Sequence, residues 1–374
     1  MKKIRLVKPH LPRLEEIQDD VRATLESGHL TNFGAYSERL EMEVRQLLGV
    51  KHALCVSNAT TGLMLLLSTL PERSEVLVPS FTFLPTVQPI LWNSLAPVFV
   101  DIDPESYTIL PDLVASNLSN ETAAILAVNT FGAPCAIEQL GKVARSKGVR
   151  LFFDSAHALG SMHNDRYLGG FGDAEVFSLS ATKLLPCGEG GVITTNDDSI
   201  FEAILNGRNY GFVHKGRDCS NLGLNGKITE FSAILGLRGI GSLNKRVRRR
   251  NEIAQAYYRH LSALPGLSFQ RISPGDMSTY KDFTVVVDSQ EYGMDRVALR
   301  NELGGRGIET ASYFSPAIHQ MTYFRRKSFR QTQMDNTNLI QERIVSLPIY
   351  SDLSNEELEY VVQAMQDVHR AARS

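Results

Sequence analysis

Cysteine is scarce in this sequence of 374 residues, and its four cysteines (55, 135, 187 and 219) are far apart and form no CxxC pair. A disulfide framework or a zinc site is therefore not expected, and a reducing compartment suits the chain. No stretch approaches the about 18 continuous apolar residues of a membrane span, and the N-terminal segment MKKIRLVKPHLPRLEE has no apolar run of signal-peptide length. We expect a soluble, cytoplasmic protein with no membrane contact and no bound metal.

Neither sign of charge is in excess, because 39 Lys and Arg residues against 41 Asp and Glu residues leave a formal net charge of −2. A global attraction to nucleic acid or to anionic membranes is therefore not expected. The basic cluster KRVRRR at 245–250 opens an amphipathic helical pattern and contains no aromatic residue. We therefore interpret this cluster as a solvated helix face or as contacts to a substrate phosphate, and not as a DNA-binding site. A DNA-binding regulator remains a remote alternative.

Internal repeats and low-complexity segments are also lacking, and the length allows two domains with substantial cores. Short apolar strands alternate with helical patterns through residue 195, which predicts a mostly parallel sheet with helices on both faces. The predicted strands are 53–56, 75–78, 97–101, 123–129, 149–153, 176–179 and 192–195; the predicted helices before the last strand are 13–27, 36–48, 63–70, 84–92 and 135–147. From about residue 245 the pattern changes to a smaller α+β unit, so we predict domains at 1–244 and 245–374.

A lysine lies between the last two of these strands. The segment VFSLSATKLLPCGEGGVITT, residues 176–195, indicates a strand, a glycine-rich loop with Lys183, and a second strand. A lysine held between packed strands suits a covalent amine, although most lysines are ordinary surface charges. Asp154 follows another predicted strand, and ligands of open α/β sheets collect past the carboxyl ends of strands. Asp154 and Lys183 are therefore candidates for one site.

Two further segments follow strand ends. Residues 57–61 (SNATT) lead from a strand into a helix, an arrangement that points free N–H groups and the positive end of a helix at an anion. Helix capping alone explains the same residue types equally well. Phe83 is either a core residue or an aromatic cover for a flat ring.

Pyridoxal 5′-phosphate (PLP) needs all of these parts. Its aldehyde needs a lysine, and its pyridine nitrogen needs a carboxylate. Its phosphate needs N–H and hydroxyl groups as hydrogen-bond donors, and its ring needs a flat face to pack against. Lysine has an unperturbed pKa of about 10.4, too high for a base at neutral pH, and a site with nearby positive charge would lower it. Lys183 would then exchange a proton with a bound amine.

Seven ordered motifs extend over nearly the whole chain. They are Asn-Ala-Thr at 58–60, PSFTF at 79–83, PVFVD at 97–101, DSAH at 154–157, FSLSATK at 177–183 with GEGG at 188–191, GLNGKITE at 223–230 and PAIH at 316–319. These motifs resemble those of the nucleotide-sugar aminotransferases, the DegT/StrS group of fold-type I PLP-dependent enzymes. The resemblance implies a large, mostly parallel seven-stranded sheet domain and a smaller C-terminal α+β domain.

The same resemblance assigns roles around the cofactor. Lys183 would bind the aldehyde covalently, Asp154 would pair with the pyridine nitrogen, and His157 would approach the 3-hydroxyl group. The remaining cofactor contacts are Ala59, Thr60 and Ser178 at the phosphate, Asn225 from the other subunit of a homodimer, and Phe83 on the ring. Ala59 stands where the family has glycine, so the turn must avoid positive φ or accept strain. Ser155 replaces an alanine, which we expect to be tolerated.

The substrates implied are L-glutamate and the keto group of a nucleotide-linked deoxysugar. Tyr313, His319 and Glu189 would face the sugar, and residues 312–336 have the polar and aromatic composition of a lid or substrate loop. The sequence around Lys183 and residues 208–212 looks most similar to the branch acting on dTDP-4-keto-6-deoxyhexoses. Amination at C3 and a PLP-dependent sugar dehydratase are the alternatives, although related dehydratases carry histidine in place of the lysine.

Overall fold

A central sheet of seven strands organises the computed structural model, which describes residues 3–213 and 218–373. The strands are β1 (His52–Val56), β2 (Glu75–Pro79), β3 (Ala96–Val100), β4 (Thr122–Val128), β5 (Arg150–Asp154), β8 (Ala174–Ser178) and β9 (Gly191–Thr195). Their order is β1-β9-β8-β5-β4-β2-β3, and β9 runs antiparallel to both of its neighbours. The predicted α/β fold with a mostly parallel sheet is confirmed.

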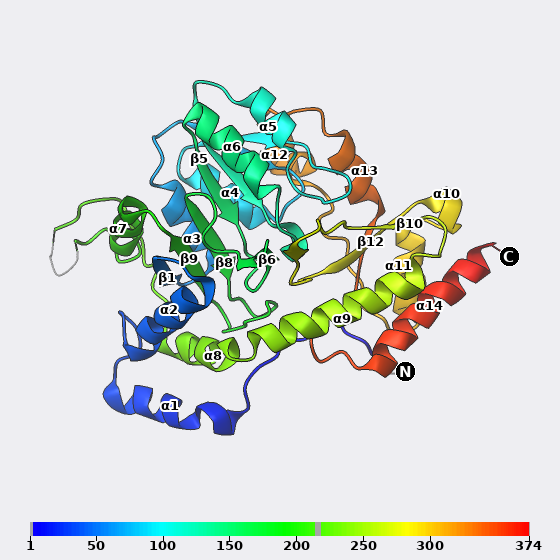
Figure 1. Ribbon diagram of the computed structural model, residues 1–374, viewed down its shortest axis with the longest axis horizontal. Coiled ribbons are helices and arrows are strands. Elements are labelled where there is room, and N and C mark those ends of the chain that lie inside the picture. Colours follow the sequence, from blue (N-terminus) through cyan, green and yellow to red (C-terminus); the bar gives the residue numbers. More distant parts are fainter. Residues whose placement is uncertain (1–2, 214–217, 374) are drawn as a thin grey trace.

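Helices cover both faces of this sheet (Figure 1), because nearly every strand residue is apolar and buried. One face packs against α2 (Ala35–Leu48), α5 (Pro111–Asn117), α6 (Ile137–Lys147) and α8 (Glu230–Ile240). The other face packs against α3 (Ala59–Leu67), α4 (Leu84–Trp92), α7 (Asp198–Gly207) and α12 (Thr322–Arg325). The first helix, α1 (Leu14–Ser27), packs on α8. A 3₁₀ turn, η1 (Thr130–Gly132), follows β4.

A smaller unit follows, built on the antiparallel sheet β10-β12-β13. Its elements are β10 (Leu267–Phe269), β12 (Phe283–Val287), α10 (Ser289–Tyr292), α11 (Arg296–Gly305), η2 (Ile318–Gln320), α13 (Asp335–Arg343), β13 (Ile344–Leu347) and α14 (Asn355–Arg373). The capping box predicted for the last helix is present, since Ser354 and Glu357 each accept a hydrogen bond from the other's backbone amide. A third small sheet joins β11 (Asp276–Met277), β6 (Met162–His163) and β7 (Arg166–Tyr167).

Helix α9 (Leu243–Leu261) connects the two units. Leu243 and Val247 belong to the core beneath the large sheet, whereas Ile253 and Tyr257 belong to the core of the small unit. Figure 1 shows α9 extending from beside α8 to beside α14. The predicted boundary between residues 244 and 245 falls inside this helix, so the division into domains stays a prediction.

Part of the basic cluster at 245–250 is buried inside the molecule. Arg246 and Arg250 are 4% and 2% exposed. The Arg246 guanidinium donates to the carbonyls of Leu184 and Gly239, and that of Arg250 to the carbonyls of residues 280 and 281. Two of the five charges of the cluster are therefore unavailable to a nucleic acid.

Other predicted elements differ at their ends. The helix predicted at 63–70 begins at Ala59, because Asn58 is its N-cap and accepts a hydrogen bond of 2.8 Å from the amide of Thr61. The loop predicted at 312–336 is irregular apart from two short helices, η2 and α12, and its last two residues begin α13. Among the residues that the structure describes, no helix is both long and apolar enough to cross a membrane.

Candidate active site

A cavity of about 210 Å³ lies at the carboxyl ends of β4, β5 and β8, beside the start of α3. Eight of the eleven predicted site residues line it. They are Ala59, Thr60, Phe83, Asp154, His157, Ser178, Lys183 and Glu189. The sheet topology brings them together, because the parallel strands end at one edge and the loop before β9 returns to that edge.

Asp154 is the acid of this cavity and is only 5% exposed. Its Oδ2 accepts a hydrogen bond of 2.7 Å from the hydroxyl of Thr86, and its Oδ1 accepts one of 3.0 Å from the amide of Ala156. Burial raises the pKa of Asp154, whereas these two donors and the charge of Lys183 act in the opposite direction. Two fixed donors therefore hold the carboxylate in one orientation.

Lys183 lies on the loop between β8 and β9, as predicted. The loop is closed by backbone hydrogen bonds, among them those from the amide of Lys183 to the carbonyl of Ser180 and from Leu179 to Gly190. Within the described residues, no hydrogen-bond acceptor is found for its amine. Burial, and then the charge of Lys281, lowers the pKa of Lys183 from 10.5 to about 8. A much larger fraction of this amine is neutral near pH 7 than of an ordinary lysine.

The first turn of α3 is the segment predicted as an anion cradle, and this role stays a prediction. The side chain of Asn58 satisfies the amide of Thr61, and the amides of Ala59 and Thr60 have no acceptor within the helix. A Cβ atom at Gly191 would lie 2.7 Å from the nitrogen of Ala59, so the start of β9 needs glycine to approach this closely. Ala59 adopts helical geometry and not a positive φ, so its replacement of glycine introduces no strain.

His157 and a group of phenylalanines form the face of the cavity. His157 stacks on Phe131 at a centroid distance of 6.3 Å, and Phe83 stacks on Phe314 at 6.2 Å. Burial, followed by the charges of Lys183 and Lys281, holds the pKa of His157 well below its usual range, so the imidazole is neutral. Its Nδ1 is buried and has no partner among the described residues.

Three predicted site residues lie outside this cavity. Asn225 is exposed and forms a β-bridge with Asn209. Tyr313 lies beside Lys281, whose amine is 6.0 Å from the centre of the ring. His319 is fixed between the hydroxyl of Ser80, at 2.7 Å, and the side-chain oxygen of Asn338, at 3.1 Å. The structure brings none of these three together with Lys183, and their roles remain predictions.

Among the cavity residues that were not predicted are Thr82, Thr86, Asn129 and Phe314. Thr82 and Thr86 are spaced by four residues at the start of a helix, which places both hydroxyls on the face that meets Asp154. Asn129 is the last residue of a predicted strand, and that position was a usable signal. Phe314 lies in the segment 312–336, which was predicted as a lid or substrate loop, but no pattern distinguishes it from the other aromatic residues of that segment.

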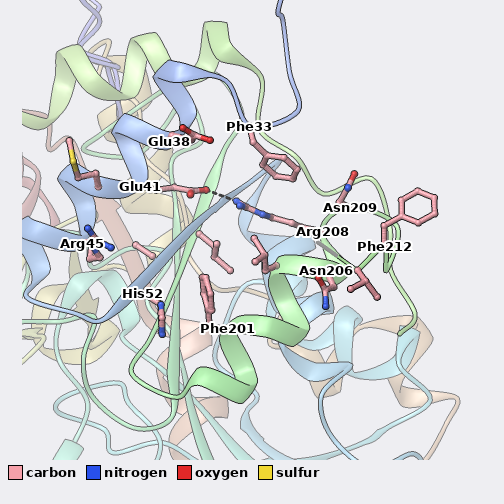
Figure 2. A pocket seen from close by; sticks show the side chains of 15 residues that line it. Phe33, Glu38, Glu41, Arg45, His52, Phe201, Asn206, Arg208, Asn209 and Phe212 are labelled. Atoms are coloured by element: carbon pink, nitrogen blue, oxygen red, sulfur yellow. Dashed lines mark hydrogen bonds and ion pairs between the residues drawn. The ribbon is translucent and has the colours of Figure 1, made fainter. Parts of the chain in front are cut away.

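A larger cavity, of about 650 Å³, lies between α2 and α7 (Figure 2). Its buried cation, Arg208, forms an ion pair with Glu41, donates a hydrogen bond of 2.8 Å to the carbonyl of Cys55, and lies over the ring of Phe33. The Nε of Arg208 is buried and has no hydrogen-bond partner among the described residues. None of the predicted catalytic residues lines this cavity.

Comparisons with known proteins agree with this arrangement. Residues 13–366 match the sequence model of the DegT/DnrJ/EryC1/StrS aminotransferase family. GDP-perosamine synthase of Escherichia coli O157:H7 is 29% identical over 372 residues, which are 99% of each chain. The structure of DesI in the presence of its TDP-sugar product has a TM-score of 0.93 and 32% identity, over 100% of this chain and 95% of that one. The structure of DesV from S. venezuelae has a TM-score of 0.88 and 26% identity, over 98% and 100% of the two chains.

Proposed function

Since this chain belongs to the DegT/DnrJ/EryC1/StrS aminotransferase family, we propose that it transfers the amino group of L-glutamate to the keto carbon of a nucleotide-linked deoxysugar. Aminotransferases of this family depend on PLP, and the chain is a sugar aminotransferase. The observation that carries the proposal is the cavity in which the lysine of depressed pKa, Lys183, and the buried acid Asp154 meet the anion cradle of α3. No other cavity described above combines these three parts.

The residues of the cavity fit PLP. The two amides without an acceptor at the start of α3 suit its phosphate, together with the hydroxyl of Ser178. The unpartnered Nδ1 of His157 suits the hydroxyl of its ring, and Asp154 suits its pyridine nitrogen. When bound, PLP supplies an electron sink that makes the Cα–H bond of an amino acid labile.

The side chains then have separate tasks. Asp154 holds a proton on the pyridine nitrogen, and its own orientation is fixed by Thr86 and Ala156. The neutral amine of Lys183 removes the proton from Cα of the amino donor and returns a proton to the sugar carbon. Phe83 and Phe314 cover the ring and exclude water from it.

We propose a dTDP-4-keto-6-deoxyhexose as the acceptor. This choice is supported by the 32% identity to DesI, whose structure was analysed in the presence of its TDP-sugar product, and by the residues around Lys183. GDP-perosamine synthase is 29% identical, so a GDP-linked sugar is the main rival. The test is to incubate the purified protein with PLP, L-glutamate and either dTDP- or GDP-4-keto-6-deoxyhexose, and to identify the product by NMR.

The expected result is a 4-amino sugar and 2-oxoglutarate in the dTDP reaction, and neither product with Lys183→Ala. Amination of a 3-keto-6-deoxyhexose supplied in its place, with no product from the 4-keto sugar, would support the C3-aminating alternative. A deoxysugar formed without amine transfer would support the dehydratase. If the protein binds no PLP and retards DNA at physiological salt, the regulator with its 245–250 cluster replaces the whole proposal.

We further propose a homodimer with shared active sites. Asn225 is exposed, and the described part of its segment carries exposed apolar side chains, which are Tyr210, Phe212, Val213 and Leu222. A second copy of the chain would cover them and place Asn225 at its partner's phosphate site. The proposal includes a cytoplasmic location, which is supported by four cysteines that are all unpaired.

Subunit mixing tests the shared site. Lys183→Ala and Asn225→Ala chains are each expected to have little activity. In a mixed dimer, one of the two sites regains both residues, so activity should return to about one quarter of the wild-type value at equal mixing. Absence of recovery in mixed dimers isolated by two affinity tags would contradict the shared site.

A further inference from the structure

A buried chain of hydrogen bonds runs beneath the floor of the cavity. The side-chain amide of Asn129 donates to the hydroxyl of Ser155 over 2.8 Å, and this hydroxyl donates to Oε2 of Glu175 over 2.7 Å. The exposed fractions of the three residues are 1%, 0% and 0%. Ser155 therefore does more than replace an alanine, because its hydroxyl joins an acid inside the sheet to a residue that lines the cavity.

Glu175 determines which group donates in each hydrogen bond of this series. Oε1 of Glu175 accepts hydrogen bonds from the amides of Gly169, at 2.6 Å, and Phe171, at 3.0 Å. Oε2 takes the single proton of the Ser155 hydroxyl, so this hydroxyl can only accept from Asn129. An ionised carboxylate in this place keeps every hydrogen bond pointing the same way, and because burial raises the pKa of Glu175 to about 7, this form predominates above neutral pH.

Asn129 is consequently held as a donor. Its side-chain oxygen already accepts a hydrogen bond of 2.9 Å from the amide of Cys135, so its NH₂ group must face Ser155. Its own backbone amide donates to the carbonyl of Asp154 over 3.0 Å, which ties it to the strand end that carries the acid. Ser155 uses one of the two N–H bonds, and no described residue accepts the other.

The cavity supplies the missing acceptor if PLP binds there. Of the polar groups of PLP, the pyridine nitrogen is matched by Asp154, the aldehyde by Lys183 and the phosphate by the start of α3. The ring oxygen remains, and an oxygen of this type accepts more than one hydrogen bond, so that Asn129 and His157 can both reach it.

We propose that Asn129 is an additional cofactor-binding residue that donates its second N–H to the ring oxygen of PLP, and that Ser155 and Glu175 are positioning residues that keep it in this orientation. The inference rests on the proposed cofactor. It deepens the proposed function, because it assigns to the cavity a donor that the sequence did not indicate.

The test compares Asn129→Ala, Ser155→Ala and Glu175→Gln with the wild type in two measurements other than turnover. Equilibrium dialysis gives the Kd for PLP, and a pH titration of the visible absorption of the bound cofactor gives its midpoint. Asn129→Ala and Ser155→Ala should raise the Kd about tenfold or more. They should also move the midpoint to higher pH, because a ring oxygen without this donor holds the neighbouring proton more tightly.

Glu175→Gln has a distinct expected result. The glutamine amide can donate to Ser155, which frees the serine proton and removes the fixed direction of the chain. The shift of the midpoint should be in the same direction and smaller. Ser161→Ala is the matched control, since Ser161 is a fully buried serine that donates to the carbonyl of Gly132 and does not line the cavity. It should keep the wild-type Kd and midpoint.

Wild-type Kd and midpoint in Asn129→Ala and Ser155→Ala would overturn the inference, and so would a loss of thermal stability without a spectral shift. If Asn129→Ala does not fold, Ser155→Ala and Glu175→Gln decide the question by the same two measurements. A wild-type protein that binds no PLP refutes the proposed function, whereas a wild type that binds PLP beside unaffected variants refutes the inference alone.

Discussion

The hydroxyl of Thr86 donates a hydrogen bond of 2.7 Å to Oδ2 of Asp154. Because its proton is used in this way, Thr86 accepts a hydrogen bond from Thr82, whose hydroxyl lies 2.8 Å away. Thr86 belongs to the first turn of α4, Thr82 lies two residues before this helix, and Asp154 ends β5. Helix α4 follows β2, and β5 lies two positions from β2 in the sheet order. The helix thus stabilises the charge of an acid that ends a different strand.

The first prediction follows from this bond. Thr86→Val keeps the shape of the side chain and removes the donor, so the ionised form of Asp154 loses about 1.5 kcal/mol or more. The value of kcat/KM should fall about tenfold or more. Thr86→Ser should recover most of it, and Thr82→Val, which does not touch the acid, should have a smaller effect. Equal activity of Thr86→Val and wild type would show that the bond is unimportant.

A second prediction concerns the pH dependence of Lys183. With its pKa at about 8, its amine becomes neutral, and therefore reactive toward an aldehyde, at a lower pH than other lysines. The rate at which the PLP-free protein captures PLP should rise steeply between pH 6 and 8 and level off above this range. Stopped-flow absorbance measures this rate. A lysine peptide, the control, should continue to gain reactivity up to about pH 10; the same behaviour in the protein would contradict the lowered pKa.

The meeting of Asp154 and Lys183 could be predicted from the sequence. Each follows an apolar strand, and the carboxyl ends of parallel strands share one edge of a sheet. The proximity of two residues far apart in sequence can therefore be predicted without knowing any tertiary contact. The anion cradle could be predicted for the same reason. The position of Ala59 in the first turn of α3 also agrees with the strain-free alternative for this residue.

The partners of buried polar groups could not be predicted in this way. Glu175 lies on β8 inside the large sheet, where a repeating apolar pattern predicts no acid, and only its neighbours in space explain it. Arg246 and Arg250 look like surface charges in a basic cluster, yet backbone carbonyls from segments far away in sequence accept their hydrogen bonds. Periodicity identifies a helix face but not the carbonyl groups that face it.

A third prediction uses the pair of acids around His163. Its Nδ1 lies 2.5 Å from Oδ1 of Asp276, and its Nε2 contacts Glu138, so the α6 segment, β6 and β11 are joined through one ring. Although burial acts against it, hydrogen bonds to these two acids raise the pKa of His163 above 6.5. The charged ring therefore stabilises the fold at a pH below 6.5, and this contribution is lost as the pH rises through the folded-state pKa.

Urea unfolding at pH 6 and at pH 9 tests this dependence. The hydrogen bond to His163 lowers the pKa of Glu138, whereas burial raises the pKa of Asp276 from 3.8, so the comparison with His163→Gln is needed to isolate the ring. The wild type should lose roughly 1 kcal/mol more than His163→Gln between the two pH values. An equal loss in both proteins would show that His163 is not the group that responds.

The last prediction concerns the start of α2. Gly34 is the N-cap residue of this helix and has no side chain to offer, so the carboxylate of Glu230 replaces it and accepts hydrogen bonds from the amides of Tyr36, at 2.8 Å, and Ser37, at 3.3 Å. Glu230→Ala should lower the free energy of unfolding by about 1 to 2 kcal/mol. Glu38→Ala, which removes an exposed acid from the same helical turn, should lower it much less. Glu230 is the first residue of α8, which packs on α2. A similar loss of free energy in the two variants would mean that Glu230 stabilises α2 through its charge near the helix macrodipole, and not through the cap hydrogen bonds.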